Sequence, residues 1–155
     1  MLERKIGALN VRKQGAPQEI DSIQILLRWP ARHAGRFEEI FQTVMDLIGQ
    51  APPQLLWEIL DYLVSNGIGD LRIHLSATGA GPLPGASIET RPDGRYDQYT
   101  IHIDAGLLES EEDPLAFIHA LSLGFTKLYM HSRGLDPTRA TLEEIRPWKE
   151  KLGFP

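Results

Sequence analysis

The chain contains no cysteine, and this absence removes several kinds of chemistry at once. Disulfide bonds, thiolate catalysis and cysteine-based zinc sites are all excluded. The 155 residues must therefore be held together by a hydrophobic core, which a hydrophobic content of 42% is enough to build. We expect a single domain over residues 1–155. Since proteins without disulfides suit a reducing compartment, we expect it to be cytoplasmic.

A surplus of basic residues and long apolar runs are missing as well. The formal net charge is −5, whereas binding to nucleic acid requires Lys and Arg in excess to neutralise phosphates. No stretch approaches the roughly 18 apolar residues of a membrane span. The opening stretch MLERKIGALNVRKQG has no apolar run of signal-peptide length. We therefore expect neither nucleic acid nor a membrane as a partner.

Alternation of apolar and polar residues predicts strands in several parts of the chain. Residues 20–29 place Ile23, Ile25, Leu27 and Trp29 on one face of a strand that ends before Pro30. The sequence PDGR separates two alternating segments and is typical of a hairpin turn. In that hairpin we expect Ile88 opposite Tyr99, Glu89 opposite Gln98 and Arg91 opposite Tyr96. The predicted strands are residues 5–12, 20–29 and 70–77, and the hairpin spans residues 86–104.

Apolar residues at helical spacing predict three longer helices. They cover residues 36–48, 53–66 and 114–132. The last is apolar nearly all round and should lie at the centre of the domain, beginning at Asp113 and Pro114. Thr141 and Glu144 form a capping-box pattern for a further helix, which we expect Pro147 to break in two. The fold class is therefore α+β, with a mostly antiparallel sheet of four or five strands and helices packed on one face.

The order of hairpin, acidic loop and buried helix over residues 86–131 resembles the core of the zincin metallopeptidases. That family carries HExxH on the helix, where two His bind zinc and the Glu activates a water molecule. His119 stands in the position of the first ligand. Ala120 replaces the Glu, and Leu123 replaces the second His. The resemblance therefore implies a degenerate enzyme scaffold that has lost both the metal and its chemistry, while a core helix with one hydrogen-bonded His accounts for the same residues.

A second arrangement of histidines allows a different metal site. His74 and His102 occupy outward positions on two predicted strands, with Asp104 on the same face. Two His and one carboxylate form a known ligand set. A small metal-dependent hydrolase using His74, His102 and His119 is therefore one alternative, and it requires these side chains to converge.

The polar face of the predicted sheet is a candidate surface for a partner protein. Tyr and Arg are enriched at the centres of interfaces, although an ordinary solvated sheet face would carry the same residue types. The candidate partner-binding residues are Arg72, His74, Arg91, Tyr96, Gln98 and His102.

No catalytic constellation can be assembled from the sequence. The main hypothesis is therefore a non-catalytic protein–protein binding or regulatory domain without a cofactor, whose partner is another protein or a second copy of the chain. A third possibility is a small-molecule binding protein with its pocket between the helices and the sheet, where pockets commonly form.

Overall fold

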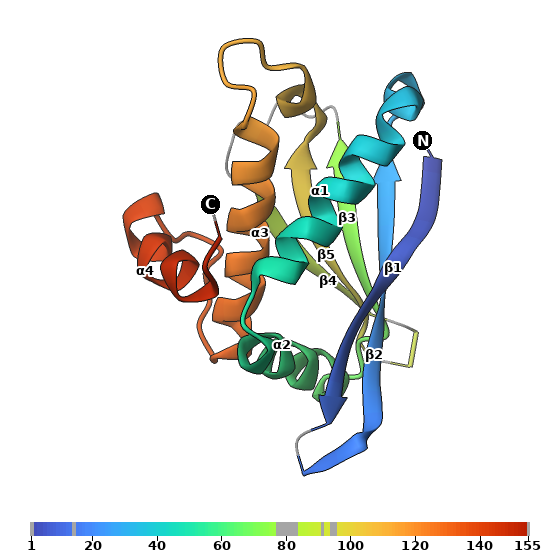
Figure 1. Ribbon diagram of the computed structural model, residues 1–155, viewed down its shortest axis with the longest axis vertical. Coiled ribbons are helices and arrows are strands. Elements are labelled where there is room, and N and C mark those ends of the chain that lie inside the picture. The colour runs from blue at the N-terminus through green and yellow to red at the C-terminus, as the bar shows by residue number, and fades with distance from the viewer. Residues whose placement is uncertain (1, 14, 77–83, 91, 94–95, 155) are drawn as a thin grey trace.

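A computed structural model describes residues 2–13, 15–76, 84–90, 92–93 and 96–154. The described residues form five strands, four α-helices and two short 3-10 helices (Figure 1). The strands are β1 (Leu2–Lys13), β2 (Ala16–Trp29), β3 (Asp70–Ser76), β4 (Gly85–Thr90) and β5 (Tyr96–Asp104). The helices are α1 (Phe37–Gln50), α2 (Pro53–Ser65), α3 (Ala116–Ser132) and α4 (Leu142–Leu152), with 3-10 turns at Ala31–Arg36 and Ala105–Glu109. The α+β class is confirmed.

The strands form one mixed sheet in the order β1-β2-β3-β5-β4. The β1/β2 and β4/β5 pairs are antiparallel, but β2/β3 and β3/β5 are parallel. The prediction of a mostly antiparallel sheet is therefore wrong. Helices α1 and α2 form a crossover connection that returns the chain to the end of the sheet at which β2 begins. Strand β3 can therefore run parallel to β2. The antiparallel strand β4 then lets β5 run parallel to β3.

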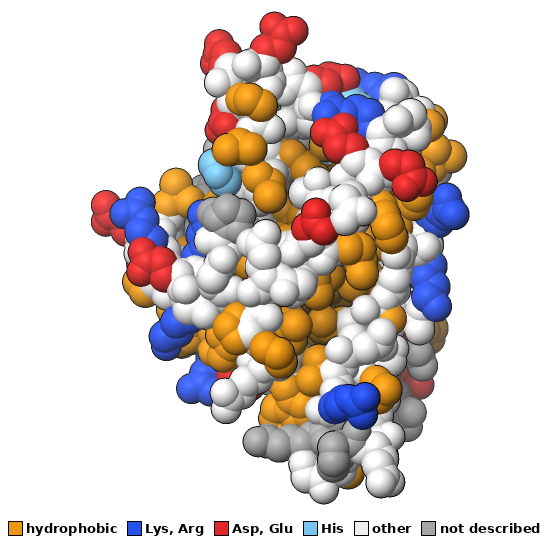
Figure 2. Space-filling model, viewed as in Figure 1, with side chains coloured by type: hydrophobic (Ala, Val, Ile, Leu, Met, Phe, Trp, Pro, Cys, Tyr) orange, Lys and Arg blue, Asp and Glu red, His pale blue; other side chains and the backbone are white. Residues whose placement is uncertain are grey.

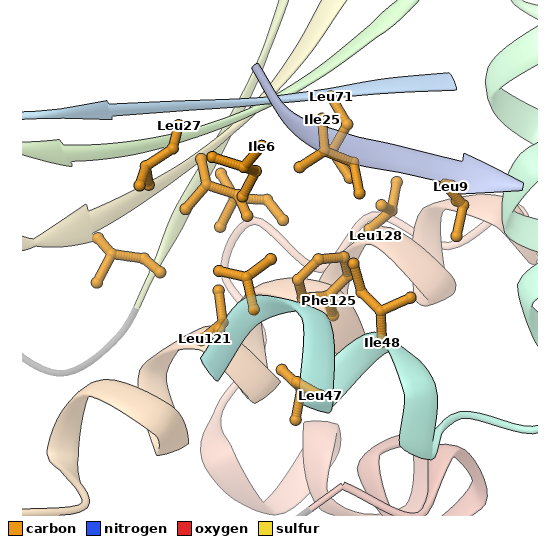
Figure 3. Packing of buried hydrophobic residues seen from close by; sticks show 14 of the residues in the cluster. Ile6, Leu9, Ile25, Leu27, Leu47, Ile48, Leu71, Leu121, Phe125 and Leu128 are labelled. Carbon is orange, nitrogen blue, oxygen red and sulfur yellow. The ribbon is translucent and has the colours of Figure 1, made fainter. Parts of the chain in front are cut away.

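The predicted alternation sets the core face of the sheet. Leu27, Ile73 and Ile101 lie opposite one another on three neighbouring strands, and all three are fully buried. Helices α1 and α3 cover this face, and side chains from the sheet and both helices interdigitate in the core (Figures 1 and 3). In the hairpin, Ile88 lies opposite Tyr99 and Glu89 opposite Gln98, as predicted. A register shift then places Thr90, not Arg91, opposite Tyr96, and Arg91 itself lies outside the described residues.

Helix α3 is buried along most of its length, as its apolar sequence predicts. It packs on β4 and β5, on α1 and α2, and on α4 at its outer side (Figure 1). Close approach to β5 depends on Gly124, because a Cβ atom at this position would lie 2.5 Å from Ile101 Cγ2. Despite this apolar helix, no helix in the described ranges has both the length and the hydropathy to cross a membrane.

Helix α4 is continuous, and the predicted break at Pro147 is wrong. The helix begins with the predicted capping box, in which the Thr141 side chain accepts from the N–H of Glu144. Proline at position 147 removes the hydrogen bond to the carbonyl of Glu143, four residues earlier. Glu143 is exposed, so water can satisfy that carbonyl and the helix continues to Leu152.

Replacing Gly124 with Ala should destabilise the fold by about 1–3 kcal/mol, since the added methyl group overpacks against Ile101. Gly49→Ala is a matched control, because Gly49 also lies in a helix but has nothing within 4 Å of an added Cβ. The control should be neutral or stabilise by up to about 1 kcal/mol through helix propensity. Urea unfolding monitored by circular dichroism measures both, and equal stabilities would contradict the proposed close contact.

Candidate binding site

The sheet register brings together two of the three histidines that the metal-site alternative requires, His74 and His102. The two residues lie directly opposite each other on β3 and β5, with ring centroids 5.5 Å apart. Both are on the sheet face that points away from α1 and α3, as are Ser76 and Asp104 one row further along. The carboxylate of Asp104 accepts a hydrogen bond from the N–H of Gly106, which starts the 3-10 turn after β5.

His119 lies on the other side of the sheet. Helix α3 carries it into a hollow of about 280 Å³ between α3 and α4, which we call the α3–α4 pocket. The described residues contain no group of three His, Cys, Asp or Glu side chains able to hold a metal ion. The structure therefore brings His74 and His102 together but separates them from His119. The residues lining the α3–α4 pocket are Asp113, Ala116, His119, Ala120, Leu123, Leu142, Arg146 and Lys149.

The polar face of the sheet offers less surface than its sequence indicates. Gln98 is buried, and the side chain of Arg72 is only 16% exposed. An ion pair of 3.3 Å joins Arg72 Nη2 to Glu3 Oε2 across the intervening strand β2. Of the six residues proposed to bind a partner, Arg72, His74 and His102 are partly exposed. The backbone of Tyr96 belongs to β5, whereas Arg91 lies outside the described residues.

A more accessible site lies along β1, at one edge of the sheet. Within the described part of the chain, β1 pairs only with β2, so the backbone groups on its other side have no strand beside them. A hollow of about 440 Å³ lies between the second half of β1 and the start of α2. Val11, Leu56 and Trp57 give it an apolar character, and all three are partly exposed. We call this site the β1 groove, and its lining residues are Asn10, Val11, Arg12, Pro53, Gln54, Leu56 and Trp57.

A second, smaller hollow of about 230 Å³ adjoins the first half of β1. Arg4, Lys5 and Ile6 line it from β1, and Phe37 lines it from α1. The guanidinium carbon of Arg4 lies 4.6 Å from the centre of the Phe37 ring, a cation–π contact. Figure 2 shows hydrophobic side chains at the surface between β1 and the helices, with basic side chains along the outer margin. Both hollows thus follow the same strand edge.

Sequence reasoning did not find the β1 groove. The spacing of α2 predicts an apolar stripe, and its central members Ile59, Leu60 and Leu63 are indeed buried. Trp57 falls outside that stripe and is only partly buried, which is the signal that could have indicated a site. The position of β1 at the sheet edge was the missing information, because it depends on the parallel crossover to β3.

A partly buried hydrogen bond links β5 to the end of α3. The hydroxyl of fully buried Tyr99 contacts Nδ1 of His131, whose Nε2 lies 4.0 Å from a carboxylate oxygen of Asp136. Burial raises the pKa of Tyr99, so its hydroxyl keeps its proton and can donate to Nδ1 when that nitrogen is unprotonated. Burial also lowers the pKa of His131, against the opposing effect of Asp136. The hydrogen bond between Tyr99 and His131 therefore ties β5 to the end of α3.

Comparison with known proteins adds no relative. A scan against models of protein families, a search of curated proteins and a search of solved structures all return no match to the chain.

Acidification should destabilise the protein through His131. Because the pKa of His131 is lower in the folded state than the ordinary value of 6.5, the unfolded chain binds more protons as the pH falls below about 7. The free energy of unfolding should therefore decrease from pH 7.5 to 5.5, with a smaller slope in His131→Gln. Asp136→Asn should steepen the slope, since it removes a carboxylate that favours the protonated imidazole. Urea titrations at several pH values measure these slopes, and an unchanged slope in His131→Gln would contradict the assignment.

Proposed function

We propose that the protein is a non-catalytic binding domain that accepts an extended segment of another protein along the free edge of β1. The observation that carries this proposal is the β1 groove, in which an edge strand lies beside an apolar hollow. An edge strand offers regularly spaced N–H and C=O groups, which a peptide can use by adding itself as a further strand. The neighbouring hollow then selects among side chains.

The two faces of β1 determine which side chains of the added segment would contact the protein. Leu9 and Val11 lie on the face of the sheet that carries the helices, since Leu9 pairs with the buried Ile23. Side chains of an added strand alternate in the same way, so every second one would point toward α2. An apolar side chain of Val or Leu size that becomes fully buried there contributes about 1.5–3 kcal/mol. The β1 groove therefore favours segments with apolar residues at alternate positions.

Charge favours an acidic partner over a second copy of the chain. Strand β1 carries one acidic residue, Glu3, and four basic residues, although the whole protein has a net charge of −5. Pairing β1 with β1 of another copy would bring two basic strands together, and like charges on adjacent strands are unfavourable. An acidic segment would instead gain from the basic side chains on the length of β1 beside which it lies. The four basic residues are Arg4, Lys5, Arg12 and Lys13.

The degenerate enzyme scaffold is part of this proposal. A hairpin of β4 and β5 precedes the buried helix α3 in the order that the zincin resemblance requires. His119 and Leu123, which stand at the positions of the two zinc ligands, both line the α3–α4 pocket. The apolar side chain of Leu123 cannot bind a metal, and Ala120 cannot activate water. We therefore favour binding over a metal-dependent hydrolase.

The proposal is tested with an acetylated nine-residue peptide of alternating Glu and Val. Its addition should slow hydrogen exchange of backbone amides in β1, because strand addition gives them new acceptors. Trp57→Ala should weaken binding by about tenfold, equivalent to about 1.4 kcal/mol. Arg12→Glu should weaken it as well and reduce its dependence on salt. Nuclear magnetic resonance titration measures both the affinity and the protected amides.

Two controls separate strand addition from nonspecific contact. Val64→Ser removes another exposed apolar residue of α2 that lies outside the β1 groove, and it should leave binding unchanged. A peptide with Pro at its central position cannot complete the hydrogen-bond ladder and should bind more weakly. Equal binding of the Pro peptide, or of a peptide with Lys in place of Glu, would refute the proposed mode. Protection of β4 amides in place of β1 amides would also refute it.

A further inference from the structure

We propose that the α3–α4 pocket is a second, independent binding site, specific for a small aliphatic carboxylate. Helix α4 lies at the outer side of α3, and β1 forms the far edge of the sheet (Figure 1). The pocket is lined by α3 and α4 and the groove by β1 and α2, so the two sites are separate. The pocket's volume of about 280 Å³ corresponds to roughly nine water molecules at ~30 Å³ each. It is therefore suited to a small molecule and too small for a folded partner.

The floor of the pocket is apolar. Ala116 and Ala120 lie one turn apart on α3, and their small side chains leave the space that the pocket occupies. Leu123 extends the same surface of α3, and Leu142, which is 49% exposed, contributes from α4. Such a surface gains free energy when an aliphatic chain displaces water from it. An inorganic ion would leave this surface wet.

The charges at the pocket favour an anion. Arg146 and Lys149 are three residues apart on α4 and therefore lie on the same side of that helix. Neither side chain forms a hydrogen bond or an ion pair with any of the residues that the structure describes. His119 adds a ring nitrogen that can hydrogen-bond to a ligand. The pocket therefore has two cationic side chains that are available to an anionic ligand.

The single acidic residue of the pocket limits the charge of the ligand. One carboxylate oxygen of Asp113 accepts the N–H of Leu115 at 3.1 Å, so this side chain serves the start of α3. Its negative charge still faces the pocket and would repel a phosphate dianion more strongly than a carboxylate monoanion. The planar guanidinium of Arg146 matches the two oxygens of a carboxylate. A monocarboxylate with a short aliphatic body therefore fits both the floor and the charges.

Binding of hexanoate tests this assignment. Titration followed by nuclear magnetic resonance should show saturable shifts of the Ala116, His119 and Ala120 amides, with a dissociation constant on the order of 1 mM or below. Hexanol lacks the charge and should bind at least about tenfold more weakly, and hexyl phosphate should also bind more weakly than hexanoate. Equal or tighter binding of either compound, or no saturable binding of hexanoate by about 10 mM, overturns the proposal.

Variants locate the site and separate charge from shape. Arg146→Gln combined with Lys149→Gln should weaken hexanoate binding by tenfold or more. Lys151→Gln is the matched control, because Lys151 is a cation of the same helix that lies over the Trp148 ring and does not line the pocket. It should bind hexanoate like the wild type. Ala116→Leu should fill the floor and abolish binding with all charges kept. Undiminished binding in the double variant overturns the proposal even if Ala116→Leu fails to fold.

Discussion

Helix α3 is apolar on every side, and the other elements are arranged to cover it. The sheet covers one side, α1 and α2 cover the next, and α4 covers the outer side. Two of its buried polar side chains have hydrogen-bond acceptors: Thr126 donates to the carbonyl of Ser122, and Lys127 donates to the carbonyl of Pro84 at 2.8 Å. Burial lowers the pKa of Lys127, because it disfavours the charged form of the side chain. The hydrogen bond to Pro84 opposes this effect by giving the amino group an acceptor. The α3–α4 pocket exists because α4 must pack against this helix.

Much of the fold follows from two periodicities in the sequence. Alternation identifies β2, β3 and the β4–β5 hairpin, and spacing of three and four residues identifies α1, α2 and α3. The parallel direction of β3 relative to β2 was not predicted, because alternation identifies strands but does not show which strands are neighbours. The two helices between β2 and β3 were the available signal, since a helical connection between neighbouring strands is typical of a parallel pair. Pro147 is a strong local signal for a helix break, yet helix α4 continues through it, because water can bond the Glu143 carbonyl that loses its partner.

The candidate sites were predicted less completely than the fold. Alternation put His74 and His102 at outward positions of β3 and β5, and the pairing of these two strands makes the residues neighbours. The same periodicity could not show that the sheet separates both from His119. It also gave no sign that Gln98 is buried or that Arg72 reaches Glu3 across β2. Both the β1 groove and the α3–α4 pocket arise where two elements distant in sequence meet, so neither has a signature within one segment.

The pairing of β1 with β2 shifts register between Lys5 and Gly7. This irregularity divides the free edge of β1 into two straight lengths, residues 2–5 and residues 7–12. A flat incoming strand can stay in register with one length but not with both. The longer length holds six residues and spans ~20 Å at about 3.4 Å per residue. A partner segment of the kind proposed would therefore pair with at most six consecutive residues of this edge. The irregularity also protects against aggregation, because a long and flat edge strand could pair with strands of other copies of the chain.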